Sequence, residues 1–536
     1  MEPQAVQKSF LLKRVKALYA WFVILAFILV GSFLVYYKLN ATPEEEETAA
    51  PSTGTEKALV KVGIPVELTG VFPSIPPEVH NTAFSANIFE GLTVFRQGKI
   101  SPGLATSWSN PDTNTWRFKL RSGVTFQNGN KFSAEDVKYS IEQAQATIPQ
   151  TTDKQWPDVA QVANIASVTV VNSSTVEIKT IQPDPVLLPK LAWVFIVSKE
   201  QAEKEGFDKL VGTGPYKLKS FEKGVYTLEA NQNYWGGKPK IKEAVYKFVL
   251  PNEATKALLD GSLDITVLEN STDNKQLQQK GFSIKSFELP VVFQLLFDVA
   301  RDKTPYVDIS SNPFKDKRVR QALLYGINID EFIKNAVPNG KPASQFVTSG
   351  IFGFDQTVKR PTYDLEKAKK LLAEAGYQNG FSVTVDVPIA YQTDKEIVRQ
   401  LERLGLKAKA NILQGNQFMD KIGTFDFTII ASAWTADTLD AGDVLDTVFH
   451  TKTQTKGQAN VGGYSNPELD KLSDEASKTF DPKKRLVLLQ KAFKVALDDL
   501  PILPLYSTEN FATIRSGFAW TPHNFGLIYA YEITGR

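Results

Sequence analysis

The chain has 536 residues, which is too many for a single hydrophobic core, so at least two lobes are expected. Hydrophobic residues make up 42% and charged residues 22%, as in ordinary globular proteins, and a formal net charge of +2 gives no reason to expect nucleic-acid binding. Cysteine is absent, which excludes disulfides, thiolate catalysis and a lipid anchor on cysteine. The three histidines are far apart in the sequence, so neither a metal site nor another cofactor is expected.

An apolar run without any charged residue extends from residue 18 to residue 37. At 1.5 Å per residue, its length matches the roughly 30 Å hydrocarbon core of a bilayer. Basic residues lie before it, in segment 1–17, and acidic residues follow at 44–47, so 1–17 is predicted to be cytoplasmic and the rest of the chain extracytoplasmic. Tyr36 and Tyr37 occupy the place of a small-residue cleavage site. Segment 18–37 is therefore predicted to be an uncleaved transmembrane anchor and not a signal peptide.

Residues 40–56 are rich in Pro, Thr, Ala and Glu and show no apolar periodicity. This composition predicts a flexible extracytoplasmic tether. Such a tether raises the effective concentration of the folded part near a partner in the membrane.

The first half of the folded part is rich in strands. Residues 58–68 alternate as a strand should, and 115–120 and 124–126 are expected to pair as antiparallel strands. Ser133 and Asp136 mark the start of a helix. Further strands are expected at 167–171, 175–179, 216–220, 226–230 and 244–249.

The second half alternates between strands and helices. Helices are expected to start near Pro313, Asp330 and Asp364, and Gly376 is expected to end the last of these. Strands 381–389, 406–413 and 425–434 alternate with helices 394–405 and 417–422, followed by helices 467–478 and 482–499 and a strand at 502–506. Alternation of this kind is typical of βαβ units on a largely parallel sheet, so two α/β lobes are predicted.

Seven segments, in the correct order, resemble the extracytoplasmic solute-binding proteins of the oligopeptide, dipeptide and nickel type, which form solute-binding protein family 5. The similar segments are FEGL at 89–92 with the stretch from Gly98 to Ile141, GTGPY at 212–216, NYWGG at 233–237, PFKDKRVRQA at 313–322, YDLEKAKKLLAEAGY at 363–377, residues 426–437 and residues 464–469. GTGPY alone would indicate only a turn, whereas seven segments in order are a specific signal.

The resemblance implies a two-lobed, periplasmic-binding-protein-like (Venus flytrap) α/β fold with mixed sheets. Lobe I would comprise 57–288 plus 507–536, and lobe II 289–506. It also implies the substrate-binding subunit of an ABC importer, which captures short peptides in a cleft between the lobes and delivers them to permease and ATPase subunits. The resemblance and the anchor together predict a monomer attached to the cell membrane, with no catalytic activity.

Asp437 is the strongest candidate for a ligand-binding residue. In the family, a Trp-x-x-Asp at this place supplies the carboxylate that pairs with the α-ammonium of the peptide, and here Trp434 and Asp437 stand in that register. Its neighbours Ala433 and Thr435 are assigned to the same site, together with Val79 of the first lobe. The nearby Asp440 and Asp443 are expected to be loop acids, although either could replace Asp437.

Other matching residues have simpler expected roles. Trp108, Trp116, Gly123, Tyr234 and Trp235 are expected to serve packing and turns and not to contact the ligand, and Asp136 is expected to stabilise the start of a helix.

The chain departs from the family near the expected cleft. It has Val71-Phe72-Pro73 where the family commonly has Leu-Asp-Pro, and Asp440-Ala441 where the family often has Asp-Pro. No residue is assigned by motif to the carboxylate at the ligand's C-terminus.

Several alternatives stay open. The ligand of such a receptor could be a nickel chelate, an opine or a β-linked oligosaccharide, and the receptor could act as a sensor or adhesin instead of an importer subunit. A cell-wall hydrolase would use a pair such as Asp440 and Asp443 as acid and base. No nucleophile, metal or phosphate-binding motif accompanies that pair, so an enzyme is not expected.

Overall fold

The computed structural model describes residues 55–68, 84–96, 99–146, 160–206, 211–222, 224–270, 272–415 and 417–536. Thr53–Arg536 form one compact unit. The predicted cytoplasmic segment, the predicted anchor at 18–37 and nearly all of the predicted tether lie outside the described residues. Within the described ranges, no helix is both long enough and apolar enough to cross a membrane.

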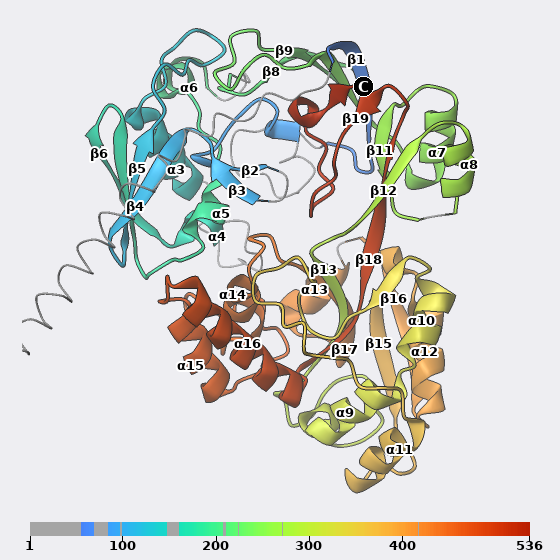
Figure 1. Cartoon of the computed structure of the whole chain (residues 1–536). Coiled ribbons are helices and arrows are strands. Elements are labelled where there is room, and N and C mark those ends of the chain that lie inside the picture. The colour runs from blue at the N-terminus through green and yellow to red at the C-terminus, as the bar shows by residue number, and fades with distance from the viewer. Residues whose placement is uncertain are drawn as a thin grey trace, which may run out of the picture. The chain divides into compact units, whose positions relative to one another are not determined.

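The elements form two groups, which we call the first and the second lobe (Figure 1). The first lobe contains β1 (Lys57–Ile64), β2 (Thr93–Arg96), β3 (Lys99–Pro102), β4 (Ala105–Asp112), β5 (Thr115–Leu120), α3 (Ala134–Ala146), α4 (Ala160–Ala163), β6 (Ile165–Asn172), β7 (Thr175–Thr180), α5 (Leu187–Leu191), α6 (Lys199–Glu205), β8 (Tyr216–Glu222), β9 (Val225–Ala230), β10 (Ile241–Phe248), α7 (Pro251–Leu259), β11 (Ile265–Leu268), α8 (Asn274–Gln279), β12 (Ser283–Glu288), β19 (Phe518–Ala519), a 3₁₀ helix (Ala530–Glu532) and β20 (Thr534–Gly535).

The second lobe contains β13 (Val291–Phe297), a 3₁₀ helix (Pro313–Lys315), α9 (Lys317–Gly326), α10 (Ile329–Ala336), β14 (Gly340–Pro342), α11 (Leu365–Glu374), β15 (Ser382–Pro388), a 3₁₀ helix (Ile389–Tyr391), α12 (Asp394–Arg403), β16 (Lys407–Leu413), α13 (Gln417–Thr424), β17 (Ile429–Thr435), α14 (Ala441–Val444), a π-helical turn (Leu445–Phe449), α15 (Pro467–Ala476) and α16 (Pro482–Asp499). The long strand β18 (Ile502–Ile514) belongs to both lobes.

β18 joins the sheets of the two lobes. Its residues 502–508 pair with β13 and β14, and its residues 509–514 pair with β11 and β12. The strand order through it is β16-β15-β17-β13-β18-β11-β1-β10-β9-β8. In Figure 1, β18 runs from the elements at the top of the picture to those at the bottom.

The sheets are mixed. β15 lies parallel to β16 and β17, and β1 lies parallel to β10 and β11, whereas the pairs that involve β13 or β18 are antiparallel. The first lobe also contains a separate antiparallel sheet with the order β4-β5-β7-β6. The prediction of an α/β fold with mixed sheets is confirmed.

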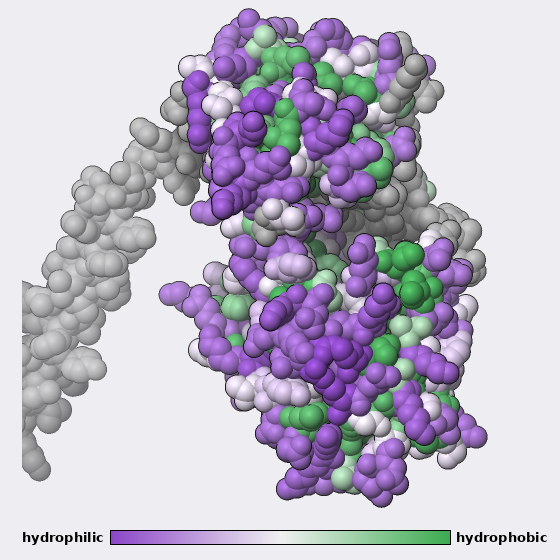
Figure 2. All heavy atoms as spheres, turned by 90° about the vertical axis from the view of Figure 1, so that its right-hand side faces the viewer, coloured by the Kyte–Doolittle hydropathy of each residue, from purple (hydrophilic) through white to green (hydrophobic). Residues whose placement is uncertain are grey.

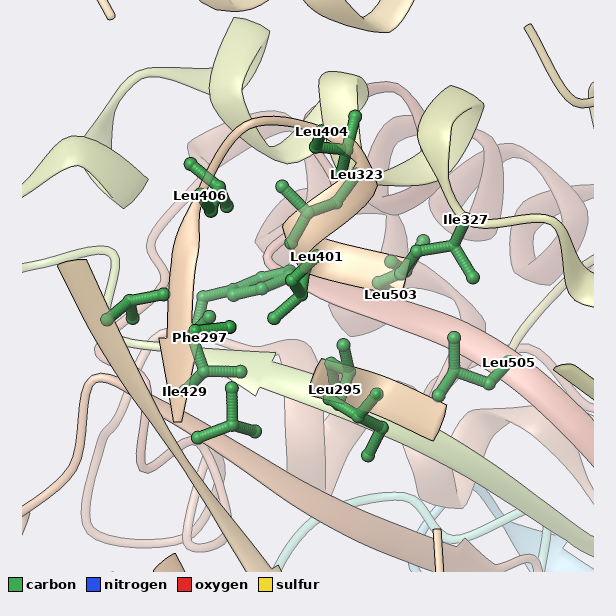
Figure 3. Close-up of a cluster of buried hydrophobic side chains, with 14 of the residues drawn as sticks. Leu295, Phe297, Leu323, Ile327, Leu401, Leu404, Leu406, Ile429, Leu503 and Leu505 are labelled. Atoms are coloured by element: carbon green, nitrogen blue, oxygen red, sulfur yellow. The ribbon is translucent and has the colours of Figure 1, made fainter. Parts of the chain in front are cut away.

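The second lobe has a hydrophobic core between the sheet and the helices α9–α12. Buried leucines of α9, α12 and β13 meet Phe297, Ile429 of β17 and Leu503 of β18 there (Figure 3). Burial of each such side chain contributes about 1.5–3 kcal/mol. The first lobe has separate cores. One contains buried side chains of β1, β9 and β10, and another contains buried side chains of the β4-β5-β7-β6 sheet and of α3. On the face with α7, α8, α10 and α12, hydrophobic side chains are scattered over a largely hydrophilic surface (Figure 2).

Local sequence signals account for many element boundaries. The Asp364 side chain accepts a hydrogen bond from the N–H of Lys367 at the start of α11, and Gly376 follows the helix with a φ of 90°. At α15, Asn466 caps the first turn and Pro467 occupies the first helical position. The expected helix starts at 133–136, 313, 330 and 364 are each found within about four residues.

Three expectations are corrected. Residues 124–126 form no strand: Thr125 makes an isolated bridge to Lys131, and β5 pairs with β4 and β7 instead. The strand expected at 425–434 begins only at Ile429, and Phe425 and Asp426 instead donate their N–H groups to carbonyls of α13, those of Ile422 and Lys421. The strand expected at 502–506 continues to Ile514, since the polar residues that follow Tyr506 pair with β14 and β12.

Candidate functional site

β17 ends at the edge of the second-lobe sheet nearest to the first lobe. It runs antiparallel to β13, and its last residue, Thr435, pairs with Val291, close to where the chain enters the second lobe from β12. β15 is parallel to β17, so both strands present their carboxyl ends at this edge. Ligands of open α/β sheets bind beyond the carboxyl ends of strands. The loop after β17 is therefore the candidate site.

The chain makes a tight turn directly after β17. The N–H of Ala436 donates to the Pro290 carbonyl at 2.9 Å, and the N–H of Leu439 donates to the Ala436 carbonyl at 3.0 Å. Asp437 and Thr438 form the tip of this turn, where Thr438 is buried and Asp437 is half-buried. Backbone hydrogen bonds on both sides thus fix the position of the Asp437 backbone.

Leu439 connects this turn to both lobes. Its φ of 56° is in the left-handed region, and Phe352 holds it there by accepting from the N–H of Ala441 at 2.8 Å and donating to the Leu439 carbonyl at 3.0 Å. Its side chain packs against the second-lobe core and also against a first-lobe cluster that includes Trp193 and Phe525. The turn is therefore part of the contact between the lobes.

Asp440 is held by an arginine of its own lobe. Its Oδ2 lies 2.5 Å from Nη1 of Arg485 and its Oδ1 lies 2.8 Å from Nη2, in a buried bidentate pair. Oδ1 also accepts from the N–H of Gly442, and Nε of Arg485 donates to the Ala476 carbonyl. This geometry gives Asp440 a structural role, contrary to the alternative in which it replaces Asp437 at a ligand.

Asp443 faces a lysine of the first lobe. Burial raises the pKa of Asp443 to about 6, an effect opposed by the positive charge of Lys190 and reinforced by the negative charges of Asp440, Asp446 and Asp184. Lys190 lies in α5, and its Nζ is 2.8 Å from Oδ2 of Asp184. A charge interaction therefore links α5 to α14, which follows the turn that carries Asp437.

Three polar atoms near this contact are buried and have no hydrogen-bond partner among the described residues. They are Nε1 of Trp434, Oγ1 of Thr438 and Nε1 of Trp193. A buried donor without an acceptor costs about 1–3 kcal/mol, so such atoms are favourable places for a ligand acceptor. Two of the three flank Asp437 in sequence.

The predicted site residues share one segment but not one face. Ala433, Trp434 and Thr435 are half-buried on β17, where alternation directs Trp434 to the face opposite to that of its neighbours. Trp434 packs against the second-lobe core. Val79 lies outside the described residues.

Three of the similar segments meet at Glu90, a buried carboxylate of the first lobe. It accepts hydrogen bonds from the Thr213 hydroxyl at 2.8 Å, the Tyr234 hydroxyl at 2.7 Å and Nε1 of Trp235 at 2.8 Å. Burial raises the pKa of Glu90, and these bonds and the nearby charge of Arg96 oppose that effect. Segments 89–92, 212–216 and 233–237 thus form a structural network, as expected for Tyr234 and Trp235. The pattern did not reveal Glu90 as its centre, because its partners lie 123 to 145 residues away.

Lys190 and Trp193 were not predicted from the sequence. They belong to a short apolar segment without a motif, and only the tertiary structure places them against residues 439–443. Among the described residues, no group of three or more His, Asp or Glu side chains is arranged to hold a metal ion.

Comparison with known proteins identifies the family. Residues 99–456 match the family described as bacterial extracellular solute-binding proteins, family 5 middle. The chain belongs to this family. Family 5 membership confirms the prediction of a solute-binding protein that performs no catalysis.

Individual family 5 relatives are similar over most of the chain. The dipeptide-binding protein of Escherichia coli K12 is 27% identical over 472 residues, which cover 81% of this chain and 86% of that protein. The structure of DppA from Helicobacter pylori in complex with the peptide STSA superimposes with a TM-score of 0.74 at 23% identity, covering 90% of this chain and 98% of that chain. NikZ from Campylobacter jejuni in complex with Ni(L-His) gives a TM-score of 0.73 at 21% identity, covering 89% and 99%.

Proposed function

We propose that this family 5 protein captures short peptides between its two lobes and delivers them to the permease and ATPase of an ABC importer. The observation that carries this proposal is the position of Asp437, at the tip of a hydrogen-bonded turn where the sheet edge of the second lobe meets the first lobe. The similarity to a dipeptide-binding protein and to a peptide complex supports this ligand class.

In this proposal, the Asp437 carboxylate pairs with the α-ammonium of the peptide. A half-buried carboxylate at a lobe interface loses water when the lobes close, and its attraction for a cation then strengthens. The Trp434 indole N–H and the Thr438 hydroxyl, both without a described partner, would donate to peptide carbonyls. Ala433, Thr435 and Val79 are proposed to line the same site.

Lobe limits at 288/289 and 506/507 are part of the proposal, with 57–288 plus 507–536 as lobe I and 289–506 as lobe II. β18 changes its pairing partners between Thr508 and Glu509, two residues beyond the proposed second limit, which supports a crossing segment there. Segment 18–37 is proposed to anchor a monomer to the cell membrane, with 40–56 as its tether. Mass spectrometry of the mature N-terminus tests the anchor, and a chain that starts beyond Tyr37 would contradict it.

Native mass spectrometry of the purified full-length chain, followed by calorimetric titration, tests the ligand class. The proposal predicts a co-purified short peptide and saturable binding of free di- to tetrapeptides, with N-acetylated peptides bound at least ~30-fold more weakly because they lack the ammonium. A co-purified nickel chelate, opine or oligosaccharide, with no binding of any peptide, would overturn it.

Peptide uptake in cells distinguishes transport from sensing. Deletion of the protein is expected to abolish uptake of a labelled peptide that the purified protein binds, and the full-length protein is expected to restore it. Unchanged uptake after deletion would favour a sensor or adhesin.

A further inference from the structure

A pocket of about 590 Å³ lies in the second lobe, and none of its lining residues belongs to the turn after β17. It is formed by α9, by α16 and by the loop at 355–361 that precedes α11. The side of α16 that lines it includes Val487, Lys491 and Lys494, which share one helical face at spacings of three and four residues. Val487 remains 49% exposed, so this helix face is open toward the pocket.

Arg360 lines the pocket and has an incomplete set of hydrogen bonds. Its Nη1 donates to the carbonyls of Ala343 and Pro504. Its Nη2 is buried without a partner, and Nε has no acceptor among the described residues. No described carboxylate lies within ion-pair distance of it, and the charge of Asp330 acts only from farther away. Burial lowers the pKa of Arg360 to about 10, which reflects the cost of placing this charge out of water.

Arg320 of the same lobe is buried, whereas Arg360 is half-buried, and Arg320 shows how an arginine with a purely structural role is bonded. Arg320 donates through Nε and Nη2 to the Asp499 carbonyl and through Nη1 to the carbonyls of Phe314 and Lys315. All three of its nitrogens therefore have acceptors, as expected of an arginine that only supports the fold. Arg360 has acceptors for one nitrogen, and its Nε–Nη2 edge is the fork that matches a carboxylate or phosphate.

The surroundings of Arg360 favour an anion. Lys359, Lys491 and Lys494 also line the pocket, against the carboxylates of Asp355 and Asp498. Neither Lys491 nor Lys494 forms an ion pair with any described residue. Cationic groups thus outnumber anionic groups by four to two, and the side chains of Val487 and Tyr325 provide an apolar wall.

We propose that this pocket is a second binding site, for a small organic anion whose carboxylate or phosphate pairs with the Nε–Nη2 edge of Arg360. The apolar body of the ligand lies against Val487 and Tyr325, and Lys491 and Lys494 attract it from the rim. This site is separate from the proposed peptide site, and neither depends on the other.

Calorimetric titration of the full-length protein tests the site, with phenyl phosphate and benzoate as the two probes. We expect saturable binding of at least one probe with a Kd at or below about 10 mM, and we expect the other probe to compete with it. Lys491→Gln/Lys494→Gln, on the exposed face of α16, is expected to weaken binding roughly 3- to 10-fold and to reduce its salt dependence. Lys483→Gln/Lys484→Gln in the first turn of the same helix is the matched control and is expected to bind as the parent does.

Arg360→Lys keeps the charge but removes the fork, and Arg360→Gln removes both. We expect losses of roughly 10-fold and more than ~30-fold, with peptide binding unchanged in each variant. If Arg360→Gln fails to fold, the test rests on Arg360→Lys and on the rim variant, Lys491→Gln/Lys494→Gln. The proposal is overturned if neither probe binds saturably, if the rim variant and its control lose equally, or if Arg360→Lys binds both probes as the parent does.

Discussion

Aspartates recur at every third position from 437 to 446, yet their surroundings differ. Asp440 forms a buried ion pair with Arg485, and Asp446 lies 2.8 Å from Nζ of Lys456. Asp443 interacts electrostatically with Lys190 of the other lobe. For Asp437, the proposed function adds a contact with the α-ammonium of the peptide. A charge left alone after burial of a pair costs about 3–5 kcal/mol, so each partner matters.

The raised pKa of Asp443 predicts a specific pH dependence. Its pKa is about 6 in the folded protein and about 3.8 as an ordinary aspartate, so the folded state binds the proton more tightly. Native stability therefore falls as the pH rises from about 4 to about 6 and changes little above that window. Asp443→Asn removes this loss, so its unfolding free energy relative to the parent should rise by up to about 3 kcal/mol across the window.

Urea unfolding of the full-length protein at a series of pH values measures this difference. Asp420→Asn, an exposed substitution on α13, is the control and is expected to show a constant difference from the parent. A constant difference for Asp443→Asn as well would contradict the assigned environment.

At the scale of elements, the sequence was sufficient to predict a helix or strand wherever its boundaries depend on residues close together in the chain. Asp364 and Gly376 delimit α11 as expected, and the alternation in residues 382–413 predicted the parallel pair β15–β16. The extent of β18 was not predictable, because its outer half pairs with β12, more than 200 residues earlier. The same limit applies to the site. The position of Trp434 near the end of a strand and of Asp437 in the turn after it was predicted from the sequence, while their contact with a ligand stays a prediction. The pairing of Asp440 with Arg485 and the approach of Lys190 depend on tertiary packing and were not predictable.

Gly376 gives a test at this scale. Its φ of 90° favours glycine, and no heavy atom within 4 Å would meet an added Cβ, so a substitution acts through backbone strain alone. Gly376→Ala is expected to destabilise the protein by about 1 kcal/mol, and Gly376→Asn by less because asparagine tolerates the left-handed region. Urea unfolding of both variants checks this order. Equal stability of the alanine variant and the parent would contradict the cap.

At the scale of the whole molecule, contacts far apart in sequence join the lobes. Trp116 of β5 lies with its ring centroid 5.8 Å from that of Phe480, and Leu439 packs into the first-lobe cluster around Trp193. Between the lobes, β18 provides a continuous strand. Closure by rotation about crossing segments is expected to change the interlobe distance while leaving each lobe rigid.

Double electron–electron resonance measures this closure, and the absence of native cysteine makes labelling specific. Labels at Glu142→Cys on α3 and Lys471→Cys on α15 report across the lobes. Labels at Lys370→Cys and Lys471→Cys report within the second lobe. Peptide is expected to shorten and narrow the first distance distribution and to leave the second unchanged. If saturating peptide alters neither distribution, hinge closure is contradicted.

The central claim is that Asp437 binds the α-ammonium of a peptide, and a double-mutant-type calorimetric cycle tests it most directly. The cycle compares the full-length parent and Asp437→Asn, each titrated with one peptide in its free and its N-acetylated form. Asparagine keeps the shape of aspartate and removes its charge, so the free peptide is expected to lose about 2–5 kcal/mol, or roughly 30- to several-thousand-fold in affinity, while the acetylated peptide loses far less. Equal losses for the two peptides, with both proteins equally stable in urea, would contradict the claim.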